Sequence, residues 1–432
     1  MSQHESTWTK VVSDHMPAME PYEELYKHFH RHPEISTLET RTSSRILQEV
    51  QRLDKKHDAG FDIKHPIGGT GLIAIHRNGP GSTILLRADI DGLPIKEKTG
   101  LSYASVDTQK DTHLDDQVKP TMHACGHDTH ITCMLAAIDT LTSARALWSG
   151  TIIYLFQPAE ERGCGARLML DDGLYTKHGC PKPEVCLGQH VFPFRAGTVH
   201  TRAGAAMSAA DSFKVTVHGK GGHGSMPHFC VDPVVIAASI VIKLQTLVSR
   251  EVPPDETAVV TVGSLQAGQT VNVIADEATL LVNIRSVSTK WRQVLLDGMK
   301  RIIRAECEAG RSPQPPDIIE TNSFPLCEND QAATAHIEDA FGRFFGDQHL
   351  PNMKPVLGSE DFPLLGSEIG VPYVFWFWGG HDPDDWDKRE KEGTLGEIPV
   401  NHSPFFAPVV QPTLRIGVEA MCVGALSYVG KM

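Results

Sequence analysis

Four short, continuously apolar runs in the first half of the chain constrain its fold most strongly. They occupy residues 71–77, 83–90, 151–158 and 184–191. Such runs are typical of strands in a mostly parallel sheet that helices cover on both faces. Residues 22–32 and 41–53 have the apolar spacing of helices. We therefore predict an α/β fold for this part of the chain.

A different pattern occupies the middle of the chain. Residues 211–219 alternate apolar and polar side chains, which predicts a half-exposed strand. Asp232–Pro233 then has the form of a helix start. Two further strands and a second helix follow, at residues 257–266, 278–286 and 289–310. The order β-α-β-β-α predicts a small α+β lobe, and the proline-rich residues 311–317 mark its end.

The first pattern returns after this lobe, with an apolar run at residues 372–380 and a closing helix. The simplest architecture is a discontinuous α/β domain, residues 1–203 and 319–432, with residues 204–318 inserted into it. In this arrangement His402 returns to the main domain from the far end of the chain.

Net charge and cysteine usage bear on partners and compartment. The chain has 53 acidic and 40 basic residues, a formal net charge of −13. This balance argues against nucleic acid or an anionic membrane as the main partner. The 9 cysteines have no spacing typical of a disulfide framework, and the first residues lack the apolar core of a secretory signal. We therefore expect a cytoplasmic protein.

Glu160 and Glu161 close the apolar run at residues 151–158. Two adjacent carboxylates have no purpose in a core, and on an ordinary surface loop they would only be solvated. At a metal site, one carboxylate binds the ion and its neighbour takes a proton from water. Pro158 stops the strand and two glycines follow closely, which indicates a tight loop near the sheet.

Further metal-binding side chains lie elsewhere in the chain. Cys125 and His127 precede a predicted helix, whose N-terminus favours thiolate, the form of cysteine that binds metal. A buried cysteine beside a helix-start histidine is the alternative interpretation. His190 ends another apolar run, and His402 lies near the C-terminus. One thiolate, three imidazoles and two carboxylates suffice for a catalytic metal centre.

Asp89 lies at the end of the apolar run 83–90. Open α/β sheets carry their sites beyond the carboxyl ends of their strands, so Asp89 is a candidate for orienting a metal ligand or the base. The alternative is a helix cap or turn former. We interpret the nearby Asp91 as structural.

The inserted lobe contributes candidates of its own. His223 stands in the glycine-rich segment 219–228, which suits a mobile histidine that reaches over a substrate. An exposed histidine in a hairpin turn is the alternative. Arg285 interrupts an apolar strand end, which suits binding of a carboxylate, although a surface arginine with a buried stem fits equally well. Asn272 lies on the same lobe.

A series of motifs along nearly the whole chain resembles the M20 metallopeptidase family. Within it they resemble the amidohydrolase branch, which holds N-acyl-amino-acid, hippurate and auxin-conjugate hydrolases. The motifs are RADIDGLP, MHACGHDTH, LFQPAEE, GQHV, GKGGHGSMPH, VNVIAD, GSEDF and NHSPFF. One departure is Ala275, where many relatives have proline; it removes no chemical group. The resemblance implies a two-metal, exopeptidase-like catalytic lobe with a mixed, largely parallel sheet, and an inserted α+β, ferredoxin-like lid that usually also forms a homodimer.

The resemblance also implies a role for each candidate residue. Glu160 would be the general base, and His223 on the lid would stabilise the oxyanion of the tetrahedral intermediate, in its own subunit or in the partner's site. Asn272 and Arg285 would hold the carboxylate end of the substrate. The metal ligands would be Cys125, His127, Glu161, His190 and His402, with Cys125 bridging two ions.

We therefore expect a metal-dependent amidohydrolase of N-acyl amino acids with two divalent ions as cofactors. Zinc or manganese suits these ligands best, and cobalt or nickel also matches them. One rival is a dipeptidase or aminopeptidase on the same centre; another is a non-catalytic metal or thiol sensor, which has no need of Glu160. The residues do not specify the acyl group, the amino acid or the native metal, and an enzyme that forms amides would use the same set.

Overall fold

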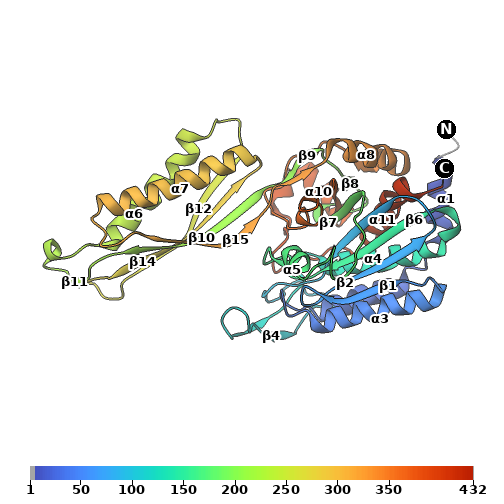
Figure 1. Ribbon diagram of the computed structural model, residues 1–432, viewed down its shortest axis with the longest axis horizontal. Coiled ribbons are helices and arrows are strands. Elements are labelled where there is room, and N and C mark those ends of the chain that lie inside the picture. Colours follow the sequence, from blue (N-terminus) through green and yellow to red (C-terminus); the bar gives the residue numbers. More distant parts are fainter. Residues whose placement is uncertain (1–4, 432) are drawn as a thin grey trace. The chain divides into compact units, whose positions relative to one another are not determined.

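The computed structural model describes residues 5–431, and the chain divides into two compact units (Figure 1). The first unit comprises the chain up to Gly204, Asn329–Lys354 and the chain from Asp361 onward. The second comprises Ala205–Glu328 and Pro355–Glu360. Each unit has its own hydrophobic core.

An 8-stranded sheet organises the first unit. In spatial order its strands are β1 (Asp62–Ile67), β2 (Gly71–Asn78), β6 (Gly150–Gln157), β3 (Thr83–Asp89), β7 (Val185–Arg195), β18 (Tyr373–His381), β8 (Val199–His200) and β17 (His349–Leu350). The central strands β6, β3, β7 and β18 run parallel, whereas β1, β2 and β8 form antiparallel pairs to either side. The predicted α/β fold with a mixed, largely parallel sheet is confirmed.

Helices cover both faces of this sheet. On one face, α4 (His127–Ser143) and α11 (Thr413–Val429) pack against the strands, and the indole N–H of Trp378 donates to Thr413 O at 3.1 Å. On the other face, Phe375 packs against Phe362, which precedes α9 (Leu364–Ser367). The other helices of this unit are α1 (Glu5–His15), α2 (Glu20–Arg31), α3 (Thr40–His57), α5 (Gly165–Asp171), α8 (Gln331–Phe345) and α10 (Pro383–Glu392). Short strands pair as β4 (Thr108–Lys110) with β5 (Val118–Pro120), and β9 (Gly204–Met207) with β16 (Cys327–Asn329).

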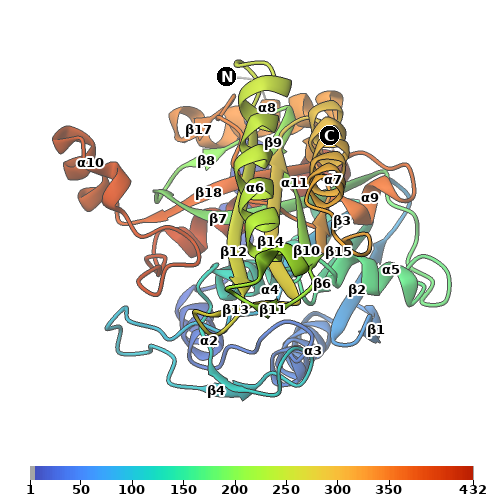
Figure 2. The ribbon, with the colours of Figure 1, turned by 90° about the vertical axis from the view of Figure 1, so that its left-hand side faces the viewer.

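The second unit is a β-α-β-β-α-β fold. Its elements are β10 (Ala209–His218), α6 (Pro233–Thr246), β12 (Ala258–Ala267), β14 (Glu277–Ser286), α7 (Thr289–Ala309) and β15 (Asp317–Phe324). The antiparallel sheet has the order β12-β14-β10-β15, which is the ferredoxin-like arrangement. Figure 2 shows α6 and α7 side by side in front of this sheet. A small pair, β11 (Gly222–His223) with β13 (Val273–Ile274), lies beyond one end.

The end of the second unit differs from the sequence-based boundary at residue 319. That position falls inside β15, which pairs with β10 along its length, so the chain leaves this unit only after Glu328. Residues 355–360 then return to it, and Val356 O accepts a hydrogen bond from Ser208 N at 3.1 Å. β15 is an edge strand in which half of the residues are exposed and none is buried, and this weakens the alternation by which sequence reveals a strand.

Helix α6 continues through a π-helical turn at Leu247–Glu251. By length and composition, Pro233–Glu251 is the one helix of the described residues that could cross a membrane. Its inner side packs into the core of the second unit through Ile236, Ile240 and Leu244. Its outer side leaves Val234, Val235 and Ile242 exposed by 42%, 63% and 69%. It is therefore a core helix with an apolar outer face.

Candidate metal centre

The predicted metal ligands and two predicted catalytic residues gather in the first unit, close to the carboxyl ends of β3 and β6 and to the middle of β7. They are Asp89, Cys125, His127, Glu160, Glu161, His190 and His402, each within 4.0 Å of another member. Asp89 ends β3, the two glutamates follow β6, and His190 lies on β7. Cys125 and His127 stand at the start of α4, and His402 precedes α11.

Two histidines of this cluster are oriented by backbone carbonyls. His127 Nδ1 donates to Asp91 O at 2.8 Å, and His190 Nδ1 donates to Val191 O at 2.7 Å. Each ring is therefore held with its Nε2 toward the cluster, as metal-binding histidines are held by partners on their other nitrogen. His190 Nε2 lies 3.4 Å from Cys125 Sγ, and His127 Nε2 makes no hydrogen bond although it is buried.

Glu161 joins these side chains to His402. Its Oε2 lies 3.2 Å from His402 Nε2, and its Oε1 lies 3.9 Å from His127 Nε2. Ligand atoms of Cys125, His127 and Glu161 all lie within 4.8 Å of one another. Glu161 Oε1 is buried without a hydrogen bond. Buried polar atoms are nearly always partnered, so this oxygen and His127 Nε2 have the environment of metal ligands.

The electrostatics of the cluster also favour cations. Burial, followed by the carboxylates of Glu161 and Glu160, raises the pKa of the Cys125 thiol well above its usual range. The helix N-terminus favours a thiolate at Cys125, whereas burial and the two carboxylates oppose this and favour the thiol. Burial disfavours a charged His127, but Asp89 and Asp91 outweigh it and raise the pKa to about 10. The residues therefore fit divalent ions, which would supply the missing positive charge.

Glu160 lies beside the proposed ligands. Its Oε2 is 4.0 Å from His127 Nε2, and the residue is only 5% exposed. Gly163 N donates to Glu160 O at 2.6 Å, which closes the tight loop that the sequence predicts. A buried carboxylate at this edge of the cluster has the chemistry either to bind a metal ion or to exchange a proton with water.

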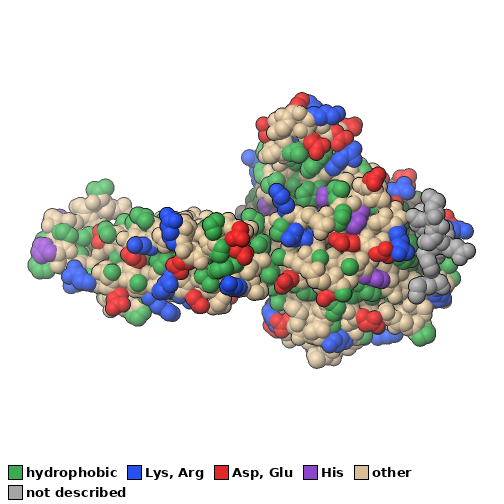
Figure 3. All heavy atoms as spheres, turned by 90° about the horizontal axis from the view of Figure 1, so that it is seen from above, with side chains coloured by type: hydrophobic (Ala, Val, Ile, Leu, Met, Phe, Trp, Pro, Cys, Tyr) green, Lys and Arg blue, Asp and Glu red, His purple; other side chains and the backbone are tan. Residues whose placement is uncertain are grey.

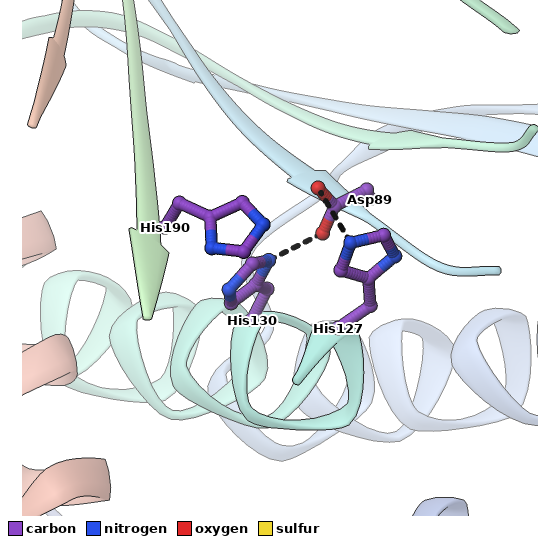
Figure 4. A group of neighbouring side chains, drawn as sticks. All are labelled: Asp89, His127, His130 and His190. Carbon is purple, nitrogen blue, oxygen red and sulfur yellow. Dashed lines mark hydrogen bonds and ion pairs between the residues drawn. The ribbon is translucent and has the colours of Figure 1, made fainter. Parts of the chain in front are cut away.

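His130 is a neighbour of the cluster that sequence reasoning missed. In Figure 4, His127 and His130 project from α4 toward Asp89, while His190 approaches from β7. His130 Nδ1 hydrogen-bonds to Asp89, and its Nε2 accepts from Val191 N at 3.0 Å. Both ring nitrogens are occupied, so His130 positions Asp89 and the strand that carries His190. The signal was present, since His130 ends the MHACGHDTH motif.

Asp89 and Asp91 both contact the cluster. Asp89 Oδ2 accepts from Arg87 at 2.7 Å and lies 3.5 Å from His127 Nε2. Asp91, which the sequence led us to interpret as structural, lies 3.3 Å from His127 Nδ1 and accepts from Glu161 N at 3.0 Å. Asp91 therefore orients two of the proposed ligands. A hydrophilic residue two positions beyond Asp89 carried no separate signal of that role.

Asn401 is a further residue that the sequence did not single out. Its side-chain amide donates to Cys125 O at 3.1 Å and to Val191 O at 3.2 Å. The next residue, His402, donates through its backbone N–H to Ala124 O at 2.8 Å and has a φ of +69°. These contacts hold His402 in an unfavourable backbone conformation beside the Cys125 segment.

The remaining predicted residues lie in the second unit. His223 is exposed, and its Nδ1 accepts from Ser225 N at 3.1 Å and from Ser225 Oγ at 2.7 Å. Because a backbone N–H can only donate, neutral His223 carries its proton on Nε2, which leaves a donor directed elsewhere. Asn272 lies beside it, with Asn272 O accepting from Gly224 N at 2.8 Å.

Arg285 is not brought together with Asn272 and His223 within the second unit. It lies near the far end of β14, where its guanidinium donates to Asn283 Oδ1 at 3.0 Å and to Leu357 O at 2.6 Å. The β11–β13 pair adjoins the other end, near Glu277. Eight residues of strand separate Glu277 from Arg285, roughly 27 Å at about 3.4 Å per residue.

Known proteins are similar to this chain in sequence and in fold. A family model, Peptidase family M20/M25/M40, matches residues 85–392. A hippurate hydrolase from Campylobacter jejuni is 32% identical over 361 residues, 82% of this chain and 87% of that protein. An N-acetyl-L-cysteine deacetylase from Bacillus subtilis is 34% identical over 384 residues, 88% of this chain and 85% of that protein.

A solved structure agrees with these matches. The crystal structure of the Bacillus subtilis YXEP protein, described as a dinuclear metal-binding peptidase of the M20 family, superposes with a TM-score of 0.71. It is 26% identical, and the match covers 94% of this chain and 97% of that one. With the metal-binding cluster described above, these matches establish that the chain belongs to the M20/M25/M40 peptidase family.

Proposed function

We propose that this protein is a metal-dependent amidohydrolase that cleaves the amide bond of N-acyl amino acids. The observation that carries the proposal is the cluster of metal-binding side chains with a further carboxylate, Glu160, at its edge. Relatives named hippurate hydrolase and N-acetyl-L-cysteine deacetylase support this substrate class. Both names describe hydrolysis of an amide between an acyl group and an amino acid.

The cofactors of the proposal are two divalent ions. Their ligands would be Cys125, His127, Glu161, His190 and His402, and when bound they would polarise the scissile carbonyl and acidify water. A mixture of sulfur, imidazole and carboxylate ligands suits zinc or manganese, and also cobalt or nickel. Asp91 and Asn401 would keep these ligands in place through the hydrogen bonds described above.

The residues of the chain divide the chemistry among them. Glu160 takes a proton from the attacking water and returns it to the departing amine. His223 donates through Nε2 to the oxyanion of the tetrahedral intermediate, a contact worth about 3–4 kcal/mol when one good donor is removed. Asp89 positions its neighbours through Arg87 and His130. Asn272 and Arg285 bind the substrate's carboxylate.

We propose further that the second unit, residues 204–318 in our prediction, is a lid that also forms a homodimer. Two features support this. The outer face of α6 exposes Val234, Val235 and Ile242, an apolar strip that a second copy would cover. Asn272 and Arg285 lie at opposite ends of one unit, so in a dimer the two groups at one carboxylate come from different subunits. Light scattering of the wild type and of Ile242→Asp tests the interface, and a monomeric wild type would exclude it.

The proposed partners are small molecules, in the cytoplasm. The nine cysteines all lie within residues 5–431 and form no disulfide there, which suits a reducing compartment. On the face of the described residues seen in Figure 3, acidic and basic side chains are interspersed. Together with the net charge of −13, this supports the absence of nucleic acid and membrane among the partners.

Hydrolysis of a substrate panel tests the reaction. Purified protein is stripped of metal with a chelator, and zinc, manganese, cobalt or nickel is restored before N-acyl amino acids and dipeptides are offered. We expect metal-dependent release of amino acid from the acylated substrates. Cleavage of dipeptides alone would favour a dipeptidase or aminopeptidase. Stoichiometric metal without any hydrolysis would favour the sensor.

A further inference from the structure

Glu39 is a buried carboxylate with a role that the helix it begins does not explain. It is the N-cap residue of α3 and is 0% exposed. Its side chain makes no cap hydrogen bond to the helix. Serine, threonine, asparagine and aspartate cap helices better than glutamate does. The start of α3 therefore gives no reason for a glutamate at this position.

Both oxygens of Glu39 are instead engaged by other segments. Oε1 accepts from Thr37 N at 2.7 Å and from Ala159 N at 2.9 Å, and Oε2 accepts from Thr70 Oγ1 at 2.6 Å. Ala159 directly precedes Glu160 and lies 120 residues from Glu39 in sequence. One oxygen atom thus ties the turn before α3 to the loop after β6.

The two amides on this oxygen belong to residues with unfavourable backbone conformations. The φ angle is +71° at Thr37 and +50° at Ala159. Left-handed backbone is costly for residues that carry a Cβ atom. Such conformations persist only where surrounding contacts hold them, and they concentrate at functional sites. Glu39 supplies a contact of that kind to both residues.

The rest of the loop is closed around Glu160. Ala159 O accepts from Cys164 N at 3.3 Å and from Gly165 N at 3.1 Å. Gly165 has no space for a side chain, since a Cβ there would lie 1.5 Å from Pro158 O. With the ends of the loop fixed in this way, the backbone conformation of Ala159 sets the direction in which the chain enters Glu160.

We propose that Glu39 is a positioning residue, which holds the loop Pro158–Gly165 in the conformation that directs the Glu160 carboxylate toward the metal centre. The role rests on the proposed function, because it concerns the base of that reaction. Its carboxyl oxygens reach Glu160 only through the backbone of Ala159, so Glu39 does not itself touch the substrate.

The chemistry of the site offers a conservative replacement. Burial, and next the carboxylate of Asp91, raise the pKa of Glu39 to about 7, so a neutral carboxyl is accommodated near neutral pH. Glutamine has the same acceptor oxygen for both amides, and its NH2 group can donate to Thr70 Oγ1. Aspartate keeps the charge but is one methylene too short to reach the same amides.

The first test compares Glu39→Ala, Glu39→Asp and Glu39→Gln in the metal-loaded enzyme. Misplacement of a catalytic group by about 1 Å costs roughly 100-fold in rate. We therefore expect kcat to fall by about 10- to 100-fold in Glu39→Ala and less in Glu39→Asp, with KM and metal content unchanged. Glu39→Gln should restore kcat to within about threefold of wild type.

Glu49→Ala is the matched control. Glu49 is a buried glutamate of the same helix that pairs with Arg45 and Arg52, both at 2.7 Å, and has no contact with the loop among its described interactions. If Glu49→Ala lowers kcat as much as Glu39→Ala, destabilisation of α3 suffices and the proposal is overturned. It is also overturned if Glu39→Ala keeps kcat within about twofold of wild type or loses metal in proportion to its activity.

A second readout is independent of catalysis. Hydrogen exchange of the backbone amides at residues 159–165 should be faster in Glu39→Ala than in wild type, and unchanged in Glu39→Gln and Glu49→Ala. Unchanged exchange in Glu39→Ala would overturn the proposal that Glu39 holds this loop in place. If wild type hydrolyses none of the offered substrates, the proposed function fails. The exchange rates then still show whether Glu39 holds the loop in place. If Glu39→Ala does not fold, the comparison of Glu39→Asp with Glu39→Gln decides by the same two readouts.

Discussion

The two units hold their chemically important side chains in opposite ways. In the first unit, His127, His190 and Glu160 are buried and their surroundings are fixed by hydrogen bonds before any ligand arrives. In the second unit, His223 and Asn272 are exposed on a short hairpin-like pair. Buried polar groups must be satisfied in advance, whereas exposed groups act only when another surface reaches them. The first unit therefore holds a preorganised centre. The second unit instead presents exposed side chains, His223 and Asn272, that can act only when another surface or a ligand contacts them.

The largest effect is expected when Glu160, the proposed base in the first unit, is replaced. Glu160→Gln keeps the shape of the side chain but cannot accept a proton, so kcat should fall by about 1,000-fold. Metal content and the melting temperature should stay as in wild type, because Glu160 lies outside the proposed ligand set. Steady-state kinetics with metal analysis checks this, and near-wild-type turnover would refute the assignment of Glu160.

A smaller effect is expected when the exposed His223 of the second unit is replaced. His223→Ala should lower kcat by about 100-fold, the loss typical of one oxyanion donor. His223 is exposed, and its side chain hydrogen-bonds to Ser225 of the same loop. Stability and metal binding should therefore not change. Steady-state kinetics at saturating substrate measures the loss of kcat.

Mixing two inactive variants sharpens this prediction. If His223 serves the partner subunit, a randomly paired mixture of Glu160→Gln and His223→Ala recovers about a quarter of wild-type activity, because half of the dimers contain one intact site. If His223 serves its own subunit, the mixture stays inactive. That result would place the complete site within one chain.

The smallest expected effect concerns stability behind the centre. His30 is buried between Asp128 at 2.7 Å and Glu97 at 3.1 Å. Burial disfavours its charge, but these hydrogen bonds outweigh burial and raise its pKa to about 9. A raised histidine pKa stabilises the folded state fully below about 6.5, and the contribution is lost as pH rises toward 9. The loss should be on the order of 2–3 kcal/mol.

Thermal or denaturant unfolding of metal-loaded protein between pH 6 and 9 measures this loss. His30→Gln should reduce the pH dependence of the free energy of unfolding in this range. His76 provides a control in another pH window. It is buried against Phe61 and Trp148, and burial lowers its pKa to about 4. Replacement of His76 should alter the pH dependence only below about 6.5. An equal slope in wild type and His30→Gln would contradict the prediction.

The sequence predicted the α/β sheet and most of the metal-binding cluster, and the reason is local. A buried parallel strand needs a continuous apolar run, and a polar residue at its end stands out against that run. Asp89, Glu160 and His190 were found in this way. Cys125 and His402 were found from motif context, because no strand leads directly to them.

The residues that support the cluster were not found. His130 lies on a helix whose residues from His127 to Thr142 are all buried. This helix therefore has no alternation of buried and exposed faces that would distinguish His130 from its neighbours. Asp91 and Asn401 act on their neighbours through hydrogen bonds that depend on where separate segments meet. The edge strand β15 was not predicted because none of its residues is buried and its burial does not alternate clearly.

By itself, the sequence determined which side chains could bind metal, which strands would carry them and that a second lobe interrupts the first. Only the tertiary structure decided the contacts over long sequence separations, such as Ala159 with Glu39 and His127 with Glu161. It also decided that Asn272 and Arg285 stand at opposite ends of the second unit. The physical reason is that apolar periodicity is set by local burial, whereas hydrogen-bond partners and ring orientations depend on how distant segments pack.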